Sequence, residues 1–412
     1  MGRGARQPAN AHPGLAVGWE EHTWEASTST VGMSRAQREV IGKRYRAALP
    51  ANIGTMPLRV DPNIAAEAED ARAEITRFDA ELSSMFPGEF APLASVLLRT
   101  ESASSSQIEH ITAGARALSL AEIGLAKHGT NASLVAANVD AMSRALDLAD
   151  DITPDGILAI HEALMRGQTH ADPGAFRDQH VWIGGSNYSP HGAAFVPPHH
   201  THVRAAIADL CAFMARTDLP LLTQTAVAHA QFETIHPFHD GNGRTGRTLV
   251  HAMLKRAGAT TRTTVPVSAG LLADTDAYFR ALTTYREGDP NAIVAQFTRA
   301  SFAAINNGTH LARDLHDVHG RWVRTLRARK DSVAWRVLPY LLRQPSVTSS
   351  LVQNSTGVSQ PAVDRALRQL EAAGVLSKAR WVVGENRKRN IVWQATDVLD
   401  ALDAFAERAR RR

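Results

Sequence analysis

Cysteine is almost absent from this sequence, with Cys211 the only one among 412 residues. A single cysteine excludes an intrachain disulfide, so a reducing compartment suits the chain. No run of about 18 apolar residues occurs, which excludes a typical membrane-spanning helix. The first residues lack an apolar signal core, and Arg6 stands where a myristoylation signal needs a hydroxyl. We therefore expect a cytoplasmic protein that has no membrane partner.

An excess of one charge is also missing from most of the chain. The formal net charge is only +4, from 45 basic and 41 acidic residues, and the residues before Asp331 are nearly neutral. From Asp331 onward, 13 basic residues face 8 acidic ones. A basic segment on a neutral body favours nucleic acid as a partner of that segment. For Arg408–Arg412, the alternative is a solvated tail.

The patterns along the chain predict a mainly α-helical protein with several domains. Residues 1–33 are rich in Gly, Ser, Thr and His and are predicted to be flexible. A helical region is expected over 34–150, because apolar residues recur at helical spacing near 34–45 and 62–85. Residues 174–198 hold β-favouring runs around a Gly-Gly-Ser-Asn turn, which predicts a β-hairpin. Residues 311–330 are expected to form a connecting helix.

Residues 331–412 are predicted to form a separate winged helix-turn-helix domain. Three helical patterns precede two strand patterns that flank a basic loop, and 360–373 would be the recognition helix. The basic side chains favour DNA binding, whereas the alternative is a protein-interaction or dimerisation module. The candidate DNA contacts are Arg365, Arg368, Arg387, Lys388 and Arg389.

Residues 236–247 concentrate the chemistry of this chain. They read His-Pro-Phe-His-Asp-Gly-Asn-Gly-Arg-Thr-Gly-Arg between two helical patterns. A loop that enters a helix offers open backbone N–H groups to an anion, and Gly241 and Gly243 can adopt positive φ and form an anion nest. Arg244 and Arg247 lie on one face of the helix start, and their guanidinium groups suit a polyphosphate. The alternative is that both are ordinary surface charges.

Two further side chains of this stretch suit nucleotide chemistry. His236 is the candidate general base, because imidazole titrates near neutrality. Asp240 is the candidate Mg²⁺ ligand, because Mg²⁺ prefers hard oxygen donors. Each could instead be structural, and His239 could join them in a zinc hydrolase site. Candidate adenine contacts, which could instead be core residues at helical spacing, are Tyr278 and Tyr285.

The stretch at 236–247 resembles the signature of Fic-domain proteins. That signature is His, any residue, Phe, any residue, Asp or Glu, Gly-Asn-Gly-Arg, two variable residues and Arg, and every fixed position is filled here. Residues 45–53, 174–198 and 228–235 resemble the family as well. The resemblance implies a Fic-type helical bundle with a small β-hairpin flap, whose catalytic core would span 151–310.

The resemblance also implies an activity, which is transfer of AMP from ATP to a Ser, Thr or Tyr hydroxyl of a target protein. His236 would deprotonate that hydroxyl, and Asp240 would hold Mg²⁺ between the α- and β-phosphates. The implied phosphate ligands are Gly241, Asn242, Gly243, Arg244 and Arg247, with Arg247 at the γ-phosphate. Auto-modification and removal of AMP are further activities of the family. An alternative is a DNA-binding transcriptional regulator with a subsidiary nucleotide-binding Fic domain.

The residues themselves leave several points open. Nothing in them excludes GTP or UTP, and they identify neither the target protein nor the modified residue. The oligomeric state is open as well, although dimers are common in the family, so a homodimer is a candidate assembly.

Residues 105–110 resemble the inhibitory motif of the family, which is Ser or Thr, three residues, Glu, and then Gly or Asn. Ser105 and Glu109 fill the first two fixed positions, whereas His110 replaces the final small residue. By this resemblance, a helix at about 102–118 would present Glu109 to Arg247 and prevent productive γ-phosphate binding. The alternative is ordinary helix-start chemistry, with Glu109 in the first turn.

Overall fold

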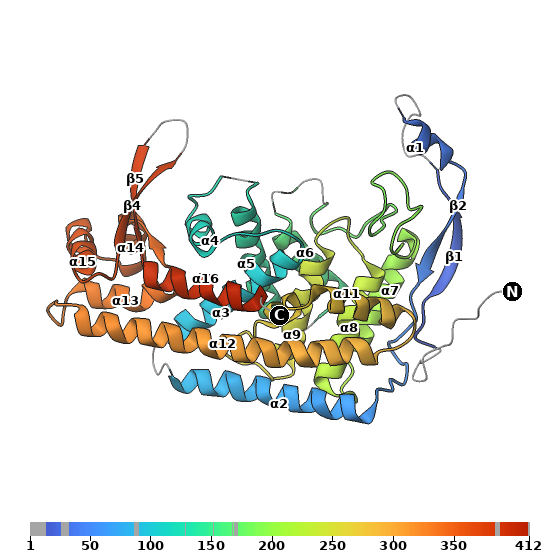
Figure 1. Ribbon diagram of the computed structural model, residues 1–412, viewed down its shortest axis with the longest axis horizontal. Coiled ribbons are helices and arrows are strands. Elements are labelled where there is room, and N and C mark those ends of the chain that lie inside the picture. The colour runs from blue at the N-terminus through green and yellow to red at the C-terminus, as the bar shows by residue number, and fades with distance from the viewer. Residues whose placement is uncertain are drawn as a thin grey trace. The chain divides into compact units, whose positions relative to one another are not determined.

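The computed structural model describes residues 14–25, 33–85, 90–127, 129–150, 152–166, 168, 172–383 and 388–410. Helices dominate them, and two small antiparallel sheets complete the fold (Figure 1). The chain forms two compact units. The first comprises 1–70, 144–256 and 276–298, and the second comprises 71–143, 257–275 and 299–412. Among the described residues, no helix is both long enough and apolar enough to cross a membrane.

The first unit contains a two-stranded sheet that the sequence did not predict. Strand β1 (Gly18–Thr23) pairs antiparallel with β2 (Arg44–Leu49), and α1 (Arg35–Glu39) lies between them in the chain. The prediction of a flexible segment over 1–33 is therefore wrong for 18–23; residues 1–13 and 26–32 lie outside the described residues. The helix expected near 34–45 is reduced to α1, because Tyr45 is buried from a strand against Val196.

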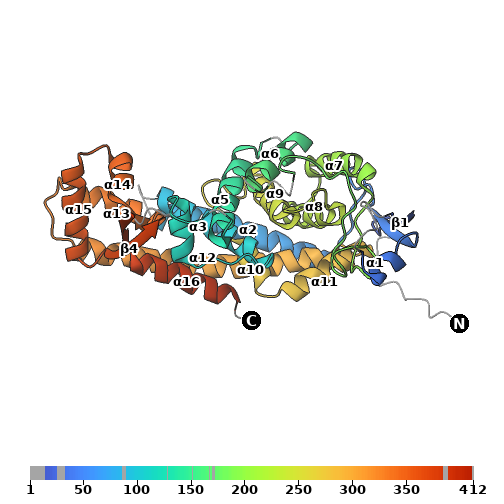
Figure 2. The same ribbon diagram turned by 90° about the horizontal axis from the view of Figure 1, so that it is seen from above.

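Helices α7 (His200–Met214), α8 (Leu221–Ile235) and α9 (Asn242–Arg256) pack together in the first unit (Figure 2). Helix α8 is buried along almost its whole length, as expected for a helix that is surrounded on all sides. The approach of α8 to α9 is close at Gly246, where an added Cβ would lie 2.9 Å from Phe232 Cδ1. Helix α6 (Pro154–Leu164) packs on α9, and α11 (Thr275–Arg286) is hydrogen-bonded to α8 through Tyr278 and Tyr285.

The predicted hairpin at 174–198, called the flap below, has no regular strands. Isolated antiparallel bridges join Ile183 to Phe195 and Ser186 to Ser189. The indole of Trp182 donates a hydrogen bond to the Ser186 carbonyl across the turn, at 2.6 Å. The chain therefore reverses direction where the sequence predicts, but the two arms of the flap are joined by isolated hydrogen-bonded bridges and not by a continuous β-ladder.

The second unit holds α3 (Phe90–Ile108), α4 (Ala115–Glu122) and α10 (Val267–Leu272). Helices α2 (Pro62–Met85), α5 (Asn131–Asp147) and α12 (Asn291–Thr325) have residues in both units. The single helix predicted at 102–118 is wrong, because α3 ends at Ile108 and α4 begins at Ala115. The connecting helix predicted at 311–330 is the end of α12, which continues past Gly320.

The C-terminal part of the second unit follows the predicted order of elements closely. Helices α13 (Val333–Arg343), α14 (Ser349–Thr356) and α15 (Gln360–Ala372) precede the strands β4 (Ser377–Val383) and β5 (Lys388–Gln394). A short strand, β3 (Ser346–Val347), pairs with β5 to give the sheet order β3-β5-β4. The tail interpretation of 408–412 is wrong for Arg408, which belongs to α16 (Thr396–Arg410) and donates to Asn307 Oδ1 at 2.7 Å.

Candidate functional site

His236 occupies a left-handed position where α8 ends. Its φ and ψ are 50° and 62°, and its N–H donates to the Phe232 carbonyl at 2.8 Å. This conformation is unfavourable for a residue with a Cβ, so the surroundings must hold it. Burial lowers the pKa of His236, and the nearby Arg177 and Arg286 lower it further. The imidazole is therefore neutral near pH 7 and can accept a proton.

Asn242 closes the loop between α8 and α9. Its Nδ2 donates to the Phe238 carbonyl at 2.8 Å, and its Oδ1 accepts from the Phe238 N–H at 2.9 Å. Phe238 is fully buried beneath the loop. The oxygen and the nitrogen of the Asn242 amide are thus both hydrogen-bonded within the protein, so this side chain fixes the conformation of the loop.

Gly241 is the residue that lets the loop turn into α9. Its φ is 79°, and an added Cβ would lie 2.9 Å from Met165 Sδ and 3.3 Å from Leu164 Cδ2. Gly243 lies within the first turn of α9 and does not share the positive φ, so the predicted two-glycine nest is wrong at that position. The open N–H groups are instead those of the first turn of α9, which have no acceptor within the helix.

Asp240 has the exposure that a metal ligand needs. Its side chain is 48% exposed, and Oδ1 accepts from the Gly241 N–H at 2.6 Å while lying 3.7 Å from Arg244 Nη2. In the described part of the chain, no three His, Cys, Asp or Glu side chains are grouped so as to hold a metal. His239 lies 3.7 Å from carboxylates of both Asp172 and Asp178, so it is directed to other partners. One carboxylate fits Mg²⁺, which commonly combines a single carboxylate with phosphate oxygens and water.

Arg244 and Arg247 are not surface charges. Each is 2% exposed, and they are among the largest fully buried side chains of the described residues. Arg244 Nη2 lies 3.7 Å from Met165 Sδ of the loop that follows α6. The surface-charge alternative is therefore wrong, because both guanidinium groups, which belong to the first turns of α9, are buried inside the unit.

The sequence analysis did not identify His161 of α6, which contacts the loop between α8 and α9. Its Nδ1 accepts from the Gly174 N–H at 3.1 Å, so Nε2 carries the proton and donates to the Asp240 carbonyl at 3.0 Å. Its ring stacks on Phe238 with centroids 3.6 Å apart. Burial lowers the pKa of His161 to about 4, which keeps this donor pattern fixed at neutral pH. No local sequence pattern indicates this contact.

Arg177 was missed as well, and it joins the flap to the catalytic loop. It is 3% exposed, and its guanidinium donates to the carbonyls of His236, Gln179 and Pro198 at 2.6–3.0 Å. Its own N–H donates to the Pro237 carbonyl at 2.9 Å. A single buried side chain therefore holds both ends of the flap against the residue that follows α8.

The candidate adenine contacts lie in the core of the first unit. Tyr278 and Tyr285 are each 1% exposed. The Tyr278 hydroxyl lies 2.7 Å from His229 Nε2, and the Tyr285 hydroxyl donates to Gln231 Oε1 at 2.8 Å. Both rings thus pack on α8 and present no open face to a nucleotide, which corresponds to the core alternative.

Glu109 lies at the end of α3 in the second unit, so the helix-start alternative is wrong. Ile111 N–H donates to the Ser106 carbonyl and His110 N–H to the Gln107 carbonyl, the bonding pattern of a Schellman C-cap. His110 is the left-handed residue of this cap, with φ 61°. The departure from Gly or Asn at His110 therefore leaves the helix end intact at a cost in strain. Ser105 is fully buried within α3.

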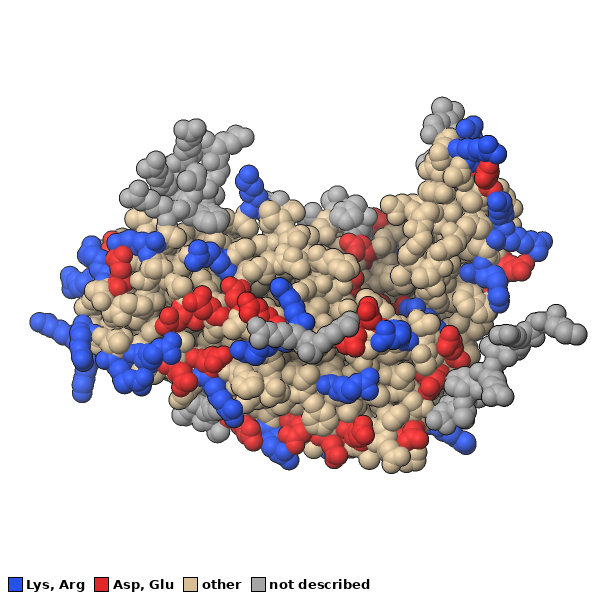
Figure 3. All heavy atoms as spheres, in the orientation of Figure 1, with Lys and Arg blue, Asp and Glu red and all other residues tan. Residues whose placement is uncertain are grey.

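The candidate DNA contacts are only partly described. Arg365 and Arg368 are exposed on α15. Arg365 lines an open groove with Arg329 and Gln369, beside the first residues of α13. Figure 3 shows basic side chains gathered over this end of the second unit. Arg387 and the side chains of Lys388 and Arg389 lie outside the described residues.

Comparison with known proteins links this geometry to one family. Residues 151–254 match the family model described as Fic/DOC family. A protein adenylyltransferase Fic from Aedes aegypti is 36% identical over 112 residues, which cover 26% of this chain and 21% of that protein. The protein adenylyltransferase fic-1 of Caenorhabditis elegans is 27% identical over 112 residues, or 26% of this chain and 20% of that protein. The matched region thus spans about a fifth of the length of these curated relatives.

The fold is similar to that of a solved structure. The crystal structure of a Fic family protein from Desulfovibrio desulfuricans G20 matches with a TM-score of 0.52 and 21% identity, covering 82% of this chain and 97% of that chain. At that identity the similarity concerns the fold alone. The match over 151–254, which contains the complete motif at 236–247, identifies a Fic/DOC family domain in this chain.

Proposed function

We propose that the protein transfers AMP from ATP to a Ser, Thr or Tyr hydroxyl of a target protein. The observation that carries this proposal is the 236–247 loop, where a neutral imidazole, the open start of α9 and two buried arginines lie within twelve residues. The relatives named protein adenylyltransferases support it. The same chemistry extends to auto-modification, with a hydroxyl of this chain as the acceptor.

The site residues have distinct roles in this reaction. The target hydroxyl oxygen bonds to the α-phosphorus while the bond to the β-phosphate oxygen breaks, and pyrophosphate leaves. The His236 imidazole accepts the hydroxyl proton. The first-turn N–H groups of α9, with Arg244 and Arg247, stabilise the charge that builds on the leaving group. Asp240 would hold Mg²⁺, which would neutralise phosphate charge when bound.

The structure changes the role that we propose for Asn242. Because both ends of its amide are bonded to Phe238, it shapes the loop instead of contacting phosphate. Phosphate recognition then depends on backbone N–H groups and the two arginines. The sparse pairing of the flap leaves backbone groups available to align a target segment by strand addition.

We further propose that Glu109 inhibits the enzyme by pairing with Arg247. Helix α3 is well anchored within the second unit, as an inhibitory element must be, and near its end Asn138 Nδ2 donates to Ser106 Oγ at 3.1 Å. Glu101 of α3 accepts hydrogen bonds from the N–H and hydroxyl of Ser268, and Asn138 Nδ2 donates to the Ser102 carbonyl at 2.8 Å. A carboxylate at Arg247 would compete with the γ-phosphate. Hydrolytic removal of AMP, with Glu109 positioning the attacking water, is the opposing activity that such a carboxylate would permit.

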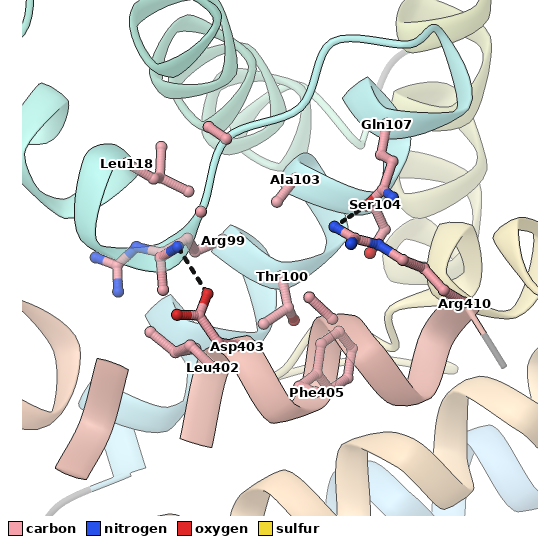
Figure 4. Close-up of a pocket in the computed structure, with 14 residues that line it drawn as sticks. Arg99, Thr100, Ala103, Ser104, Gln107, Leu118, Leu402, Asp403, Phe405 and Arg410 are labelled. Carbon is pink, nitrogen blue, oxygen red and sulfur yellow. Dashed lines mark hydrogen bonds between the residues drawn. The ribbon is translucent and has the colours of Figure 1, made fainter. Parts of the chain in front are cut away.

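Helix α16 packs beside α3, and residues of both helices line a pocket between them (Figure 4). Helix α16 therefore supports the same helix that leads to Glu109. Asp403 Oδ1 accepts from the Ala115 N–H at 3.0 Å, and Arg410 Nη2 lies 3.5 Å from Gln107 Oε1. The C-terminal part of the chain is thereby in contact with both sides of the segment that carries Glu109. We propose that it influences how firmly that segment is held.

For residues 331–412, we propose a winged helix-turn-helix domain that binds DNA. The order of three helices, the paired strands β4 and β5, and the groove lined by Arg329 and Arg365 beside Asp331 support this second function. The full-length protein should shift duplex DNA, more weakly as salt rises, and Arg365→Ala with Arg368→Ala should reduce the shift. No shift at low salt would favour a protein-interaction or dimerisation module instead. Chromatography with light scattering would show whether that module makes a homodimer.

Mass spectrometry of the protein after incubation with ATP and Mg²⁺ tests the main proposal. We expect an AMP adduct on the protein or on an added lysate protein, more abundant with Glu109→Gly and absent with His236→Ala. His239→Ala is the matched control, because this neighbouring histidine has no role in the proposed chemistry, and it should retain activity. Parallel incubations with GTP and UTP determine the nucleotide. If Glu109→Gly gave no nucleotide adduct in any of them, the proposed transferase activity would be refuted.

A further inference from the structure

Arg286, the last residue of α11, makes an unusual set of contacts in the first unit. Its guanidinium carbon lies 3.8 Å from the centroid of the Phe195 ring. Its Nη2 donates to the Glu233 carbonyl at 3.2 Å. Its Nε is buried and has no hydrogen-bond partner among the described residues. The side chain is thus held between a ring and a carbonyl, with one donor left unused.

Phe195 belongs to one of the two bridges of the flap, the one that it forms with Ile183. The Ile183 N–H donates to the Phe195 carbonyl at 2.8 Å, and the Ala194 N–H donates to the Ile183 carbonyl at 2.8 Å. Phe195 is only 7% exposed, so its contact with the guanidinium is largely shielded from water. Arg286 therefore touches the flap at this bridge.

The other contact of Arg286 is in the last turn of α8. Glu233 lies three residues before His236, which is the C-cap of that helix. The guanidinium consequently joins the bridge of the flap to the turn that presents the candidate base. Arg177 makes a second link, from the ends of the flap to the His236 carbonyl.

We propose that Arg286 is a positioning residue that fixes the flap relative to His236. The inference rests on the proposed transfer reaction, in which the flap aligns the target segment. A planar cation suits the task, because it stacks on a ring and donates in its own plane at the same time. Without it, the flap bridge would depend on its few backbone hydrogen bonds, and the target hydroxyl would be held less well.

The charge of Arg286 also affects the pKa of the candidate base, His236. The charged groups that face His236 are Arg177, Arg286 and Glu233. The two cations disfavour the imidazolium ion, whereas the Glu233 carboxylate, 3.9 Å from Nδ1, favours it. Removing the charge of Arg286 should raise the pKa of His236, and replacing it with another cation should not.

Three substitutions separate these effects. Arg286→Met keeps the aliphatic stem and removes both the plane and the charge. Arg286→Lys keeps the charge and removes the plane. Arg280→Met is the matched control, because Arg280 is exposed on the same helix. Thermal unfolding of each variant checks that the protein folds.

Hydrogen exchange of peptides that cover 183–195 reads the flap directly and requires no activity. We expect exchange to be at least about tenfold faster with Arg286→Met, from the loss of a desolvated cation–π contact, less accelerated with Arg286→Lys, and unchanged with Arg280→Met. Wild-type exchange in Arg286→Met, or equal acceleration in Arg280→Met, would overturn the proposal.

AMP incorporation, measured in the Glu109→Gly background, reads the consequence for the reaction. We expect a lower rate with both Arg286 variants, and a shift of the acidic limb of the pH profile to higher pH with Arg286→Met alone. An unchanged rate in both variants would refute the positioning role. Absence of incorporation in Glu109→Gly itself would refute the proposed transferase, while hydrogen exchange would still decide whether Arg286 holds the flap.

Discussion

Replacing Asn242 with alanine separates two roles for this side chain. Asn242 is 3% exposed, and its amide makes two hydrogen bonds to the backbone of Phe238, at 2.8 and 2.9 Å. Alanine removes both partners and leaves a buried N–H and a buried carbonyl unsatisfied. Asn242→Ala is therefore first of all a stability defect, and any loss of nucleotide binding follows from a distorted loop.

The magnitude follows from the number of groups left without partners. Each unsatisfied buried backbone group costs about 1–3 kcal/mol, so Asn242→Ala should destabilise its unit by about 2–6 kcal/mol. For a unit of this size, 1 kcal/mol corresponds to about 2–4 °C in Tm. We therefore expect the calorimetric transition of the first unit to fall by roughly 4–24 °C.

Scanning calorimetry and ATP titration should be carried out together on Asn242→Ala and on Asn187→Ala. Asn187 lies at the exposed tip of the flap and provides the control for loss of an asparagine amide. A wild-type Tm combined with much weaker ATP binding would show that Asn242 contacts phosphate directly, and the proposed role of Asn242 in shaping the loop would then be wrong.

Three further predictions concern strain and titration. His110→Gly should raise stability by about 1 kcal/mol, measured by thermal unfolding, because glycine adopts the left-handed φ of 61° without strain; a lower Tm would contradict this. Gly241→Ala should weaken both stability and ATP binding, because an alanine Cβ would lie 2.9 Å from Met165 Sδ at φ 79°; calorimetry and titration that match wild type would refute it. Burial lowers the pKa of His161 and of His199 to about 4 in the folded protein, whereas a histidine of the unfolded chain has a pKa of about 6.5. Between these two pH values the unfolded chain therefore binds more protons than the folded protein. Stability should therefore decline as the pH falls from about 6.5 to 4, and denaturant midpoints that stay constant over this range would contradict the assignment.

The sequence alone determined the features that depend on neighbouring residues. Apolar spacing predicted the helices around the central loop, and the order of helices and strands after Asp331. The motif at 236–247 identified the base, the carboxylate and the two arginines, because its residues are contiguous. The same local rules failed where burial decides the outcome. Nothing near Arg244 in the chain indicates that its side chain is almost fully buried.

Only the tertiary structure decided which distant residues support that loop. Tyr45 is hydrogen-bonded to His180, Arg177 donates a hydrogen bond to the His236 carbonyl, and Arg286 stacks on Phe195. The two residues of each pair are more than fifty positions apart in the sequence. Such partners are chosen by how whole helices and loops pack, and a side chain carries no local sign of a partner that far along the chain. The sequence therefore determined which groups can do the chemistry, and long-range packing decided how they are held.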